Sequence, residues 1–328
     1  MNPNSLAGRH FARFLALLSL AVAGAALAQG YPNRPVKVVV PWPPGQATDV
    51  AARAAADKLS QVFGQQFVID NRAGAGGTIG TDYAAKSAPD GYTILAGSSG
   101  PISIAPSVQK VPYDPDKDFE PICMLAGSPY VLVTHPSLPV ATVAELIALL
   151  RANPGKYNFA SSGTGATSHL VGELFNMSAK VTATHVPYKG SSQAVTDVIA
   201  GHVTYTIETS ASVVAHVKAG RLKALGVSSS TRALALPEIP TIEEAAGFPG
   251  FDLRAWIGFI APAGMPREVR ARLGAECQKA LGTAEMKERL LALGLEPSIL
   301  TLEEFGPFIK QQNDRFGSIA RQANIKVQ

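Results

Sequence analysis

Apolar residues recur along this chain with two alternating spacings, which predict strands and helices in regular succession. A β-branched run at 36–40 precedes a segment, 48–63, whose apolar residues repeat at the spacing of one helix face. Two further strand-like runs, 66–70 and 93–96, flank a helical stretch at 77–87. Because strand and helix patterns alternate, we predict an α/β fold with parallel strands and crossover helices.

The same alternation continues through the second half of the chain, where capping boxes mark several helix starts. A Thr-x-x-Glu box at 142–145 opens a helix that Pro154 ends, and similar boxes stand at 241–244 and 301–304. We expect strands at 130–134, 157–160, 183–186, 203–207 and 224–228, and helices at 142–153, 169–177, 191–200, 212–219, 266–281, 284–293 and 302–323.

Two short stretches rich in proline and glycine, 126–129 and 248–251, are the predicted domain boundaries. Residues 29–127 together with 253–328 would form one lobe, and residues 128–252 would form a second lobe inserted into it. About 300 residues are enough for two hydrophobic cores. The two strands that join the lobes would then act as a hinge.

The first 28 residues have the pattern of an export signal. Arg9 and Arg13 precede an apolar run at 14–27, and Ala26 and Ala28 form an A-x-A cleavage site. The apolar run is shorter than the roughly 20 residues that a membrane-spanning helix needs. We therefore expect a Sec-type signal peptide that is cleaved after Ala28, and a soluble periplasmic protein.

The charge of the chain gives no sign of a nucleic-acid partner. The whole chain has a net charge of +4, and the leader contributes two arginines and no acidic residue, so the mature protein has a net charge of +2. Lysine and arginine are scattered, without the basic run that a phosphate backbone requires.

The two cysteines, Cys123 and Cys277, lie far apart in the sequence, each among apolar residues. We expect two buried thiols, although an oxidising compartment permits the alternative of a disulfide between them. Their spacing excludes a C-x-x-C metal or redox site. No zinc-binding histidine pattern is present, so we predict neither a metal nor a cofactor.

The segment 158–170, NFASSGTGATSHL, places serine, threonine and glycine between a strand and a helix. Hydroxyl groups and the open N–H groups of a helix start favour an anion there. No lysine follows the glycines, which excludes a nucleotide P-loop. Ser168 stands where a dinucleotide motif needs its third glycine or alanine, and the required acidic residue is absent. A carboxylate is therefore the expected ligand.

Other loops also follow strands and contain candidate ligand contacts. The loop PWPPGQATD at 41–49 is stiffened by prolines, and its Asp49 either contacts a ligand or only caps the helix. Arg72 is expected to form a structural salt bridge. Lys189 either reaches the ligand or remains solvated, and His169 is expected to pack or form a hydrogen bond.

Taken together, these loops resemble a known family. The matching segments are YPNRPVKVVVPWPPGQATDVAAR, VIDNRAGAGGTIGTDYAAKSAPDGYTIL, FASSGTGATSHLVGELF, THVPYKGSSQAVTDVIAGHV and WIGFIAPAGMP. They run in unbroken order through nearly the whole mature chain. In this respect the chain resembles the periplasmic solute-binding proteins of tripartite tricarboxylate transporters, also called Bug-type receptors.

The resemblance implies a two-lobed α/β fold of the periplasmic-binding-protein class (Venus flytrap, type II-like) with a ligand cleft between the lobes. It implies a receptor, expected to be a monomer, that binds a dicarboxylate, amino acid or aromatic acid and delivers it to membrane transporter subunits. Carried over by motif, the ligand-binding residues are Trp42, Pro43, Gln46, Thr48 and Asp49 on one side, and Ser161, Gly163, Thr164, Gly165, Thr167 and Ser168 on the other, with Lys189 and Glu208 as further candidates.

Two positions depart from the family pattern. Gln46 stands where the family commonly has a second glycine, and Thr204 stands where it usually has aspartate. Both changes predict a pocket with a selectivity of its own.

Two other functions are open to this sequence. A sensory receptor for a signalling partner would have the same loops. A hydrolase is disfavoured because no G-x-S-x-G motif occurs, and the segment 97–100, GSSG, has the wrong spacing. We therefore expect a binding protein without catalytic residues.

Overall fold

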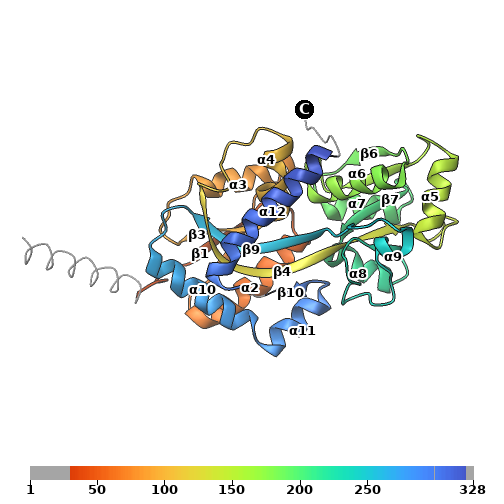
Figure 1. Cartoon of the computed structure of the whole chain (residues 1–328). Helices are drawn as coiled ribbons and strands as arrows, with labels where there is room; N and C mark the ends of the chain where they lie inside the picture. The colour runs from red at the N-terminus through yellow and green to blue at the C-terminus, as the bar shows by residue number, and fades with distance from the viewer. Residues whose placement is uncertain (1–29, 299, 323–328) are drawn as a thin grey trace, which may run out of the picture.

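Ten strands form one curled sheet in the computed structural model, which describes residues 30–298 and 300–322. The predicted leader and its cleavage site lie outside these residues. Two strands, β4 (Phe119–Thr134) and β9 (Arg254–Pro262), run through the middle of the molecule and connect two groups of helices and strands (Figure 1). The molecule therefore has two halves that share a central pair of strands.

The first half is built on parallel strands from the N-terminal third of the chain. β1 (Val36–Val40) pairs in parallel with β2 (Phe67–Asn71) and β3 (Thr93–Ser98), and β9 lies antiparallel to β3. The short β10 (Glu296–Pro297) pairs with β4. The helical segments around these strands are α2 (Ala47–Phe63), η1 (Ala75–Gly77), α3 (Thr78–Ala85), η2 (Gly100–Ile104), α4 (Ala105–Val108), α10 (Arg267–Leu281), α11 (Ala284–Ala292) and α12 (Leu302–Gln322).

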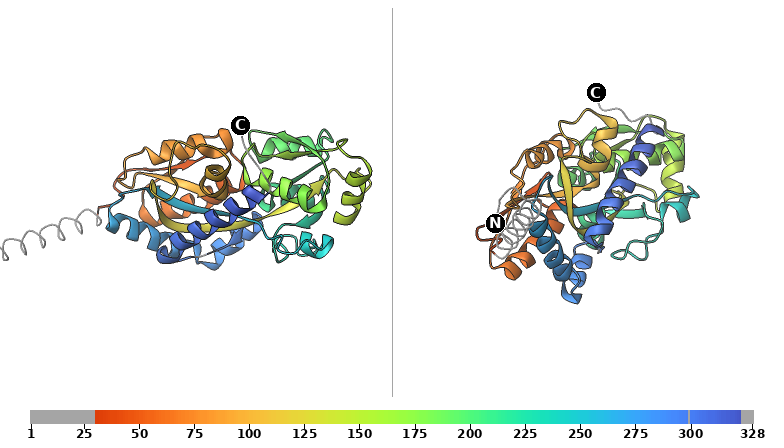
Figure 2. Two further views of the ribbon diagram at one scale, coloured as in Figure 1. Left: turned by 45° about the horizontal axis from the view of Figure 1, so that its top comes forward. Right: turned by 60° about the vertical axis from the view of Figure 1, so that its left-hand side comes forward.

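The second half repeats this plan around the far end of β4. β5 (Asn158–Ser161) pairs in parallel with β6 (Thr184–Pro187) and β7 (Tyr205–Thr209). β4 pairs antiparallel with β7 and with β8 (Lys223–Val227). The helices of this half are α5 (Val143–Ala152), α6 (Thr167–Ala179), α7 (Ser191–Ile199), α8 (Ser210–Lys218) and α9 (Ile242–Ala246). Figure 2 shows the two halves side by side along the long axis of the molecule.

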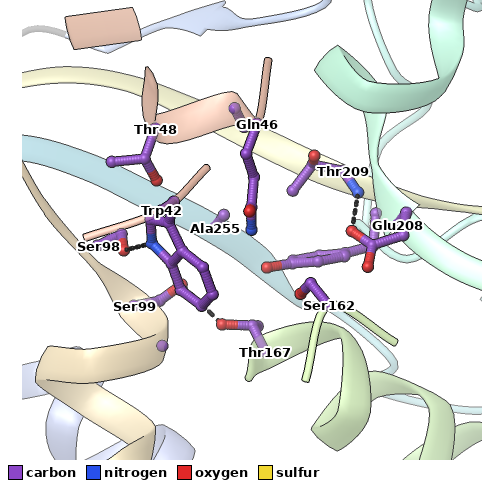
Figure 3. Close-up of a pocket in the computed structure, with 13 residues that line it drawn as sticks. Trp42, Gln46, Thr48, Ser98, Ser99, Ser162, Thr167, Glu208, Thr209 and Ala255 are labelled. Atoms are coloured by element: carbon purple, nitrogen blue, oxygen red, sulfur yellow. Dashed lines mark hydrogen bonds between the residues drawn. The ribbon is translucent and has the colours of Figure 1, made fainter. Parts of the chain in front are cut away.

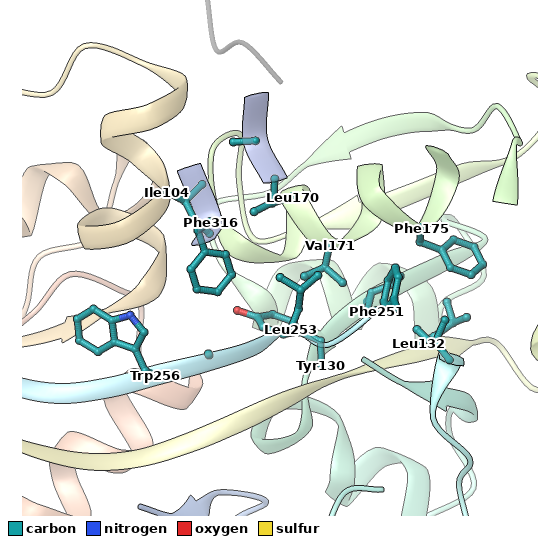
Figure 4. Packing of buried hydrophobic residues seen from close by; sticks show 14 of the residues in the cluster. Ile104, Tyr130, Leu132, Leu170, Val171, Phe175, Phe251, Leu253, Trp256 and Phe316 are labelled. Carbon is teal, nitrogen blue, oxygen red and sulfur yellow. The ribbon is translucent and has the colours of Figure 1, made fainter. Parts of the chain in front are cut away.

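A buried apolar cluster continues from one half into the other (Figure 4). Trp256 of β9 and Phe316 of α12 belong to the same cluster as Leu170 and Phe175 of α6. Each apolar side chain removed from water stabilises the folded state by about 25 cal/mol per Å² of buried surface. Apolar burial therefore stabilises the junction between the halves. Within the ranges described above, no helix is long and apolar enough to cross a membrane.

The predicted succession of strands and helices is confirmed, but the sheet is mixed where only parallel strands are predicted: β4, β8, β9 and β10 form antiparallel pairs. The two joining strands are also predicted poorly. The sequence pattern predicts only 130–134 of β4, whereas the strand begins at Phe119. Proline and glycine at positions such as Pro121 and Gly127 resemble strand breaks, and β4 accommodates irregularity through two register shifts opposite β9. β9 itself was recognised only as a family motif.

The expectation that Cys123 and Cys277 are free buried thiols is wrong, because the two residues form a disulfide. Cys123 lies on β4 and Cys277 on α10, which packs against that strand. Their Cα atoms are 6.4 Å apart, within the range of roughly 4.4–6.8 Å that disulfides require. The bond links residues 154 positions apart and so connects the C-terminal helices to the central strand.

Replacing both cysteines by alanine should lower the free energy of unfolding by about 2–5 kcal/mol, because the open chain regains the entropy of a long loop. Denaturant unfolding of the oxidised protein and of the double variant would measure the difference. Peptide mapping without reductant should recover the two cysteines as one linked pair. Equal unfolding midpoints, or two free thiols in the oxidised protein, would contradict the assignment.

Candidate functional site

A small cavity of about 20 Å³ lies between the two halves (Figure 3). It is located where loops leave the carboxyl ends of strands, the usual place for ligands in open α/β sheets. The first half contributes Trp42, Gln46, Ala47, Thr48, Ser98, Ser99 and Gly100. The second half and the joining strands contribute Ser162, Thr167, Glu208, Thr209, Tyr130 and Ala255.

Trp42 forms one wall of the cavity and is fixed by a hydrogen bond and by two glycines. Its indole Nε1 donates to Ser98 Oγ at 3.0 Å. A Cβ atom on Gly100 would lie 3.1 Å from the indole, and one on Gly77 would lie 3.3 Å from it. Both positions therefore leave no room for a larger residue without moving the ring.

Two polar residues at the start of α2 have different roles. The Gln46 side chain is buried and lines the cavity, and its Oε1 has no hydrogen-bond partner. Asp49 is also buried, but its carboxylate accepts hydrogen bonds from Gly45 N at 2.9 Å and Asn71 Nδ2 at 2.8 Å. It also pairs with Arg53. Asp49 thus stabilises the loop and the helix start.

The serine- and glycine-rich loop closes the cavity from the second half. Ser168 Oγ accepts a hydrogen bond from Ser162 N at 2.9 Å and lies 2.8 Å from Ser162 Oγ. Gly163 and Gly165 adopt φ angles of 132° and 79°, which favour glycine. This arrangement directs Ser162 and Thr167 to the cavity and uses Ser168 to hold the turn.

Two stacked histidines support this loop from behind. The rings of His169 and His185 lie 4.0 Å apart between centroids. Gly165 N donates to His169 Nδ1 at 3.2 Å, and Ser161 Oγ lies 2.6 Å from His185 Nε2. Burial, together with the neighbouring His169, lowers the pKa of His185 to about 4. As expected, His169 packs and forms hydrogen bonds.

Several loops from the two halves touch each other at the cavity. Ser99 Oγ lies 3.1 Å from Thr167 Oγ1, within hydrogen-bond distance. A Cβ atom on Gly190 would lie 2.8 Å from Pro43 Cγ and 3.2 Å from Gln46 Oε1. These contacts bring the loops of the two halves together at the cavity.

Glu208 is the acidic residue of the cavity wall, and it is 1% exposed. Ser191 Oγ donates to its Oε2 at 2.7 Å, and Thr209 N donates to the same oxygen at 3.3 Å. Burial raises the pKa of Glu208, and the nearby hydroxyls of Ser191, Ser168 and Ser162 offset part of this effect. Its other oxygen, Oε1, has no hydrogen-bond partner.

The sequence-predicted residues divide into those that line the cavity and those that surround it. Lining residues are Trp42, Gln46, Thr48, Thr167 and Glu208. Outside the lining, in the same two loops, are Pro43, Asp49, Ser161, Gly163, Thr164, Gly165 and Ser168. Lys189 is exposed, and its backbone N–H donates to Gln193 Oε1 at 3.2 Å. Arg72 pairs with Asp70, which is the structural salt bridge expected.

Several lining residues were missed by the sequence prediction. Ser98 is the last residue of β3 and Ser99 follows it, so a search of the carboxyl ends of all parallel strands would have found them. Tyr130 and Ala255 lie on the joining strands, and no sequence pattern marks them as residues of a ligand site.

The cavity lining combines hydroxyl, amide and carboxyl groups with the apolar surface of Trp42 and two alanines, and it carries no cationic side chain among the described residues. Its volume is close to that of one water molecule. Hydroxyls, the Gln46 amide and the Glu208 carboxyl can together hold a small polar group by hydrogen bonds. Within 30–298 and 300–322, no cluster of histidine, cysteine or acidic side chains could hold a metal ion.

Comparisons with known proteins give a consistent result. The sequence profile described as "Tripartite tricarboxylate transporter family receptor" matches residues 51–325. The chain is 38% identical to Protein BugT of Bordetella pertussis, over 96% of this chain and 98% of BugT.

Solved structures give the same result for the fold. The R. palustris protein Rpa4515 with adipate has a TM-score of 0.87 and 36% identity, covering 90% of this chain and 99% of its own. The periplasmic binding protein BugD has a TM-score of 0.85 and 34% identity, covering 91% and 100%. MatC from Rhodopseudomonas palustris with bound malate has a TM-score of 0.83 and 31% identity, covering 88% and 99%.

The fold is therefore the α/β fold of periplasmic binding proteins, as the loops implied. The chain belongs to the tripartite tricarboxylate transporter receptor family, whose solved members include periplasmic solute-binding proteins.

Proposed function

We propose that this protein is an extracytoplasmic receptor that binds a small carboxylate between two lobes and delivers it to the membrane subunits of a tripartite transporter. The observation that carries the proposal is the hydroxyl-lined cavity formed jointly by both halves. The adipate- and malate-bound relatives support a carboxylate as the ligand class. The family description favours transport over a sensory role.

The lobes in this proposal are residues 29–127 with 253–328, and residues 128–252. The hydrogen-bonding partner of β4 supports this division, because it changes from β9 to β7 between Pro129 and Tyr130. A cavity of about 20 Å³ is smaller than adipate or malate, so the lobes must part to admit such a ligand. β4 and β9 would bend at the junction as the hinge.

Closure around the ligand would remove water from its hydrogen bonds and strengthen them. Ser99 and Thr167 already meet across the cavity, so a carboxylate between them would bind both lobes at once. The ligand would leave chemically unchanged, since the proposal requires no catalytic residue and no cofactor. The receptor would act in the periplasm as a monomer, after removal of residues 1–28.

Melting temperature against a panel of carboxylates tests the proposed function. The signal-free protein would be unfolded, stripped, refolded and mixed with adipate, malate, citrate, acidic amino acids or aromatic acids. A true ligand at 100 times its dissociation constant should stabilise the protein by about 2.7 kcal/mol. Recovery of the unchanged compound would exclude turnover. A folded protein that no carboxylate stabilises would contradict the proposal.

Replacing Thr167 by valine should weaken binding of the best carboxylate about tenfold, because the variant loses one hydroxyl at the cavity and the contact with Ser99. Titration calorimetry would measure the dissociation constant. The matched control is Thr196→Val on the exposed side of α7, whose hydroxyl bonds only Ser192 O. Equal affinity of the wild-type protein and the Thr167 variant, with the same melting temperature, would show that this loop is not the site.

A further inference from the structure

Glu208 presents a conflict with the proposed carboxylate ligand. Its side chain is buried at the cavity wall, yet a second carboxylate beside it would meet like charge in a site shielded from water. No lysine, arginine or histidine lines the cavity among the described residues, so no cation separates the two groups. Two adjacent ionised carboxylates would oppose binding strongly.

The hydrogen bonds around Glu208 differ between its two oxygens, and this difference suggests how a carboxylate ligand is accommodated. Oε2 accepts from Ser191 Oγ at 2.7 Å and from Thr209 N at 3.3 Å. Oε1 is buried and has no hydrogen-bond partner, while the nearby Ser162 and Ser168 hydroxyls bond each other at 2.8 Å. One oxygen therefore has its donors, and the other makes no hydrogen bond in a residue that lines the cavity.

We propose that Glu208 is a specificity-determining residue that binds the ligand in its neutral form and donates its acid proton to a ligand carboxylate oxygen. This inference rests on the proposed function. Where Glu208 is ionised in the free protein, binding takes up one proton from solvent, and that proton ends on Glu208 between the two carboxyl groups. Direct hydrogen bonds between a carboxylic acid and a carboxylate are short and strong.

The direction of the pKa shift agrees with this geometry. Burial raises the pKa of Glu208, so the folded protein holds the proton to higher pH than an exposed glutamate would. Above that pKa, each unit of pH should weaken carboxylate binding about tenfold, because the proton must be recovered from solution. Affinity should therefore fall as pH rises, and it should not recover at high pH.

Other titrating groups must be separated from this effect. The elements packed against β7 carry Tyr130 on β4, His169 and Glu173 on α6, Asp197 on α7, and His216 and Lys218 on α8. Across the cavity, the first turns of α2 carry Asp49 and Arg53. Of these, Tyr130 lines the cavity, and burial raises its pKa, so it stays neutral over the range tested. His185 lies behind the loop with a pKa of about 4.

Two substitutions at one position test the proposal, with adipate and malate as probes. Glu208→Gln keeps a neutral donor of nearly the same shape, so it should bind within about threefold of the wild type at low pH. Glu208→Leu removes the donor and should weaken binding about tenfold or more. Glu238→Gln, on an exposed residue of the same half, is the matched control and should behave as the wild type.

The pH profile adds a readout that a purely structural role would not change. Dissociation constants measured over a series of pH values should be lowest where Glu208 is protonated and should rise with pH above its pKa in the wild type, and they should stay flat in Glu208→Gln. The histidines are common to both proteins, so the difference between the profiles reports Glu208. Melting temperatures without probe would identify a variant that has lost its fold.

Three results would overturn the inference. A folded Glu208→Gln that loses the probes would mean that an ionised Glu208 is required, as for a ligand with an ammonium group. Full affinity of Glu208→Leu would mean that the carboxyl makes no contact. Wild-type affinity that rises with pH would contradict the predicted direction of the pH dependence. If the wild type bound no carboxylate in the panel at any pH, the proposed function itself would fail.

Discussion

The antiparallel pairing of β4 with β9 is the constraint on which the rest of this structure depends. The two strands remain paired from Phe119 opposite Pro262 to Pro129 opposite Arg254, and β4 then pairs with β7. One strand thus sets the register of both halves. Because Tyr130 and Ala255 lie at the exchange of partners, both reach the cavity. A bend there would move the loops of the two halves apart without disturbing either set of parallel strands.

The cavity walls are fixed by hydrogen bonds and close packing more than by charge. Trp42 is held between a serine hydroxyl and two glycines, and the loop opposite is held by Ser168 and by the stacked pair of His169 and His185. Such fixed hydroxyl groups lose little entropy on binding. A buried ion pair would have had to offset the desolvation of both charges. In the proposed function, neutral donors from two lobes would avoid that cost, and binding would depend on closure.

Local signals in the sequence predicted the elements and the loops, whereas contacts between distant segments were not predictable from it. Capping residues such as Thr241 with Glu244 fixed helix starts, and the glycine and serine pattern located the loop before α6. β4 was truncated in the prediction because Pro121 and Gly127 have low strand propensity, although pairing with β9 overrides it. The disulfide of Cys123 depends on α10 packing against β4, which no spacing in the sequence encodes.

The effect of Gln46, a departure from the expected family pattern, can be understood only from its position in the structure. In the sequence it is a long amide at a position where the family resemblance predicts glycine. In the structure its Oε1 lies buried beside Gly190, without a hydrogen-bond partner, and its side chain occupies space at the cavity. An amide offers both a donor and an acceptor, as does a neutral Glu208. A ligand that left either group unpaired would bind more weakly, because the buried group would lack its hydrogen bond. Under the proposed function, these two residues together would therefore select a ligand by the direction of its hydrogen bonds as well as by its size.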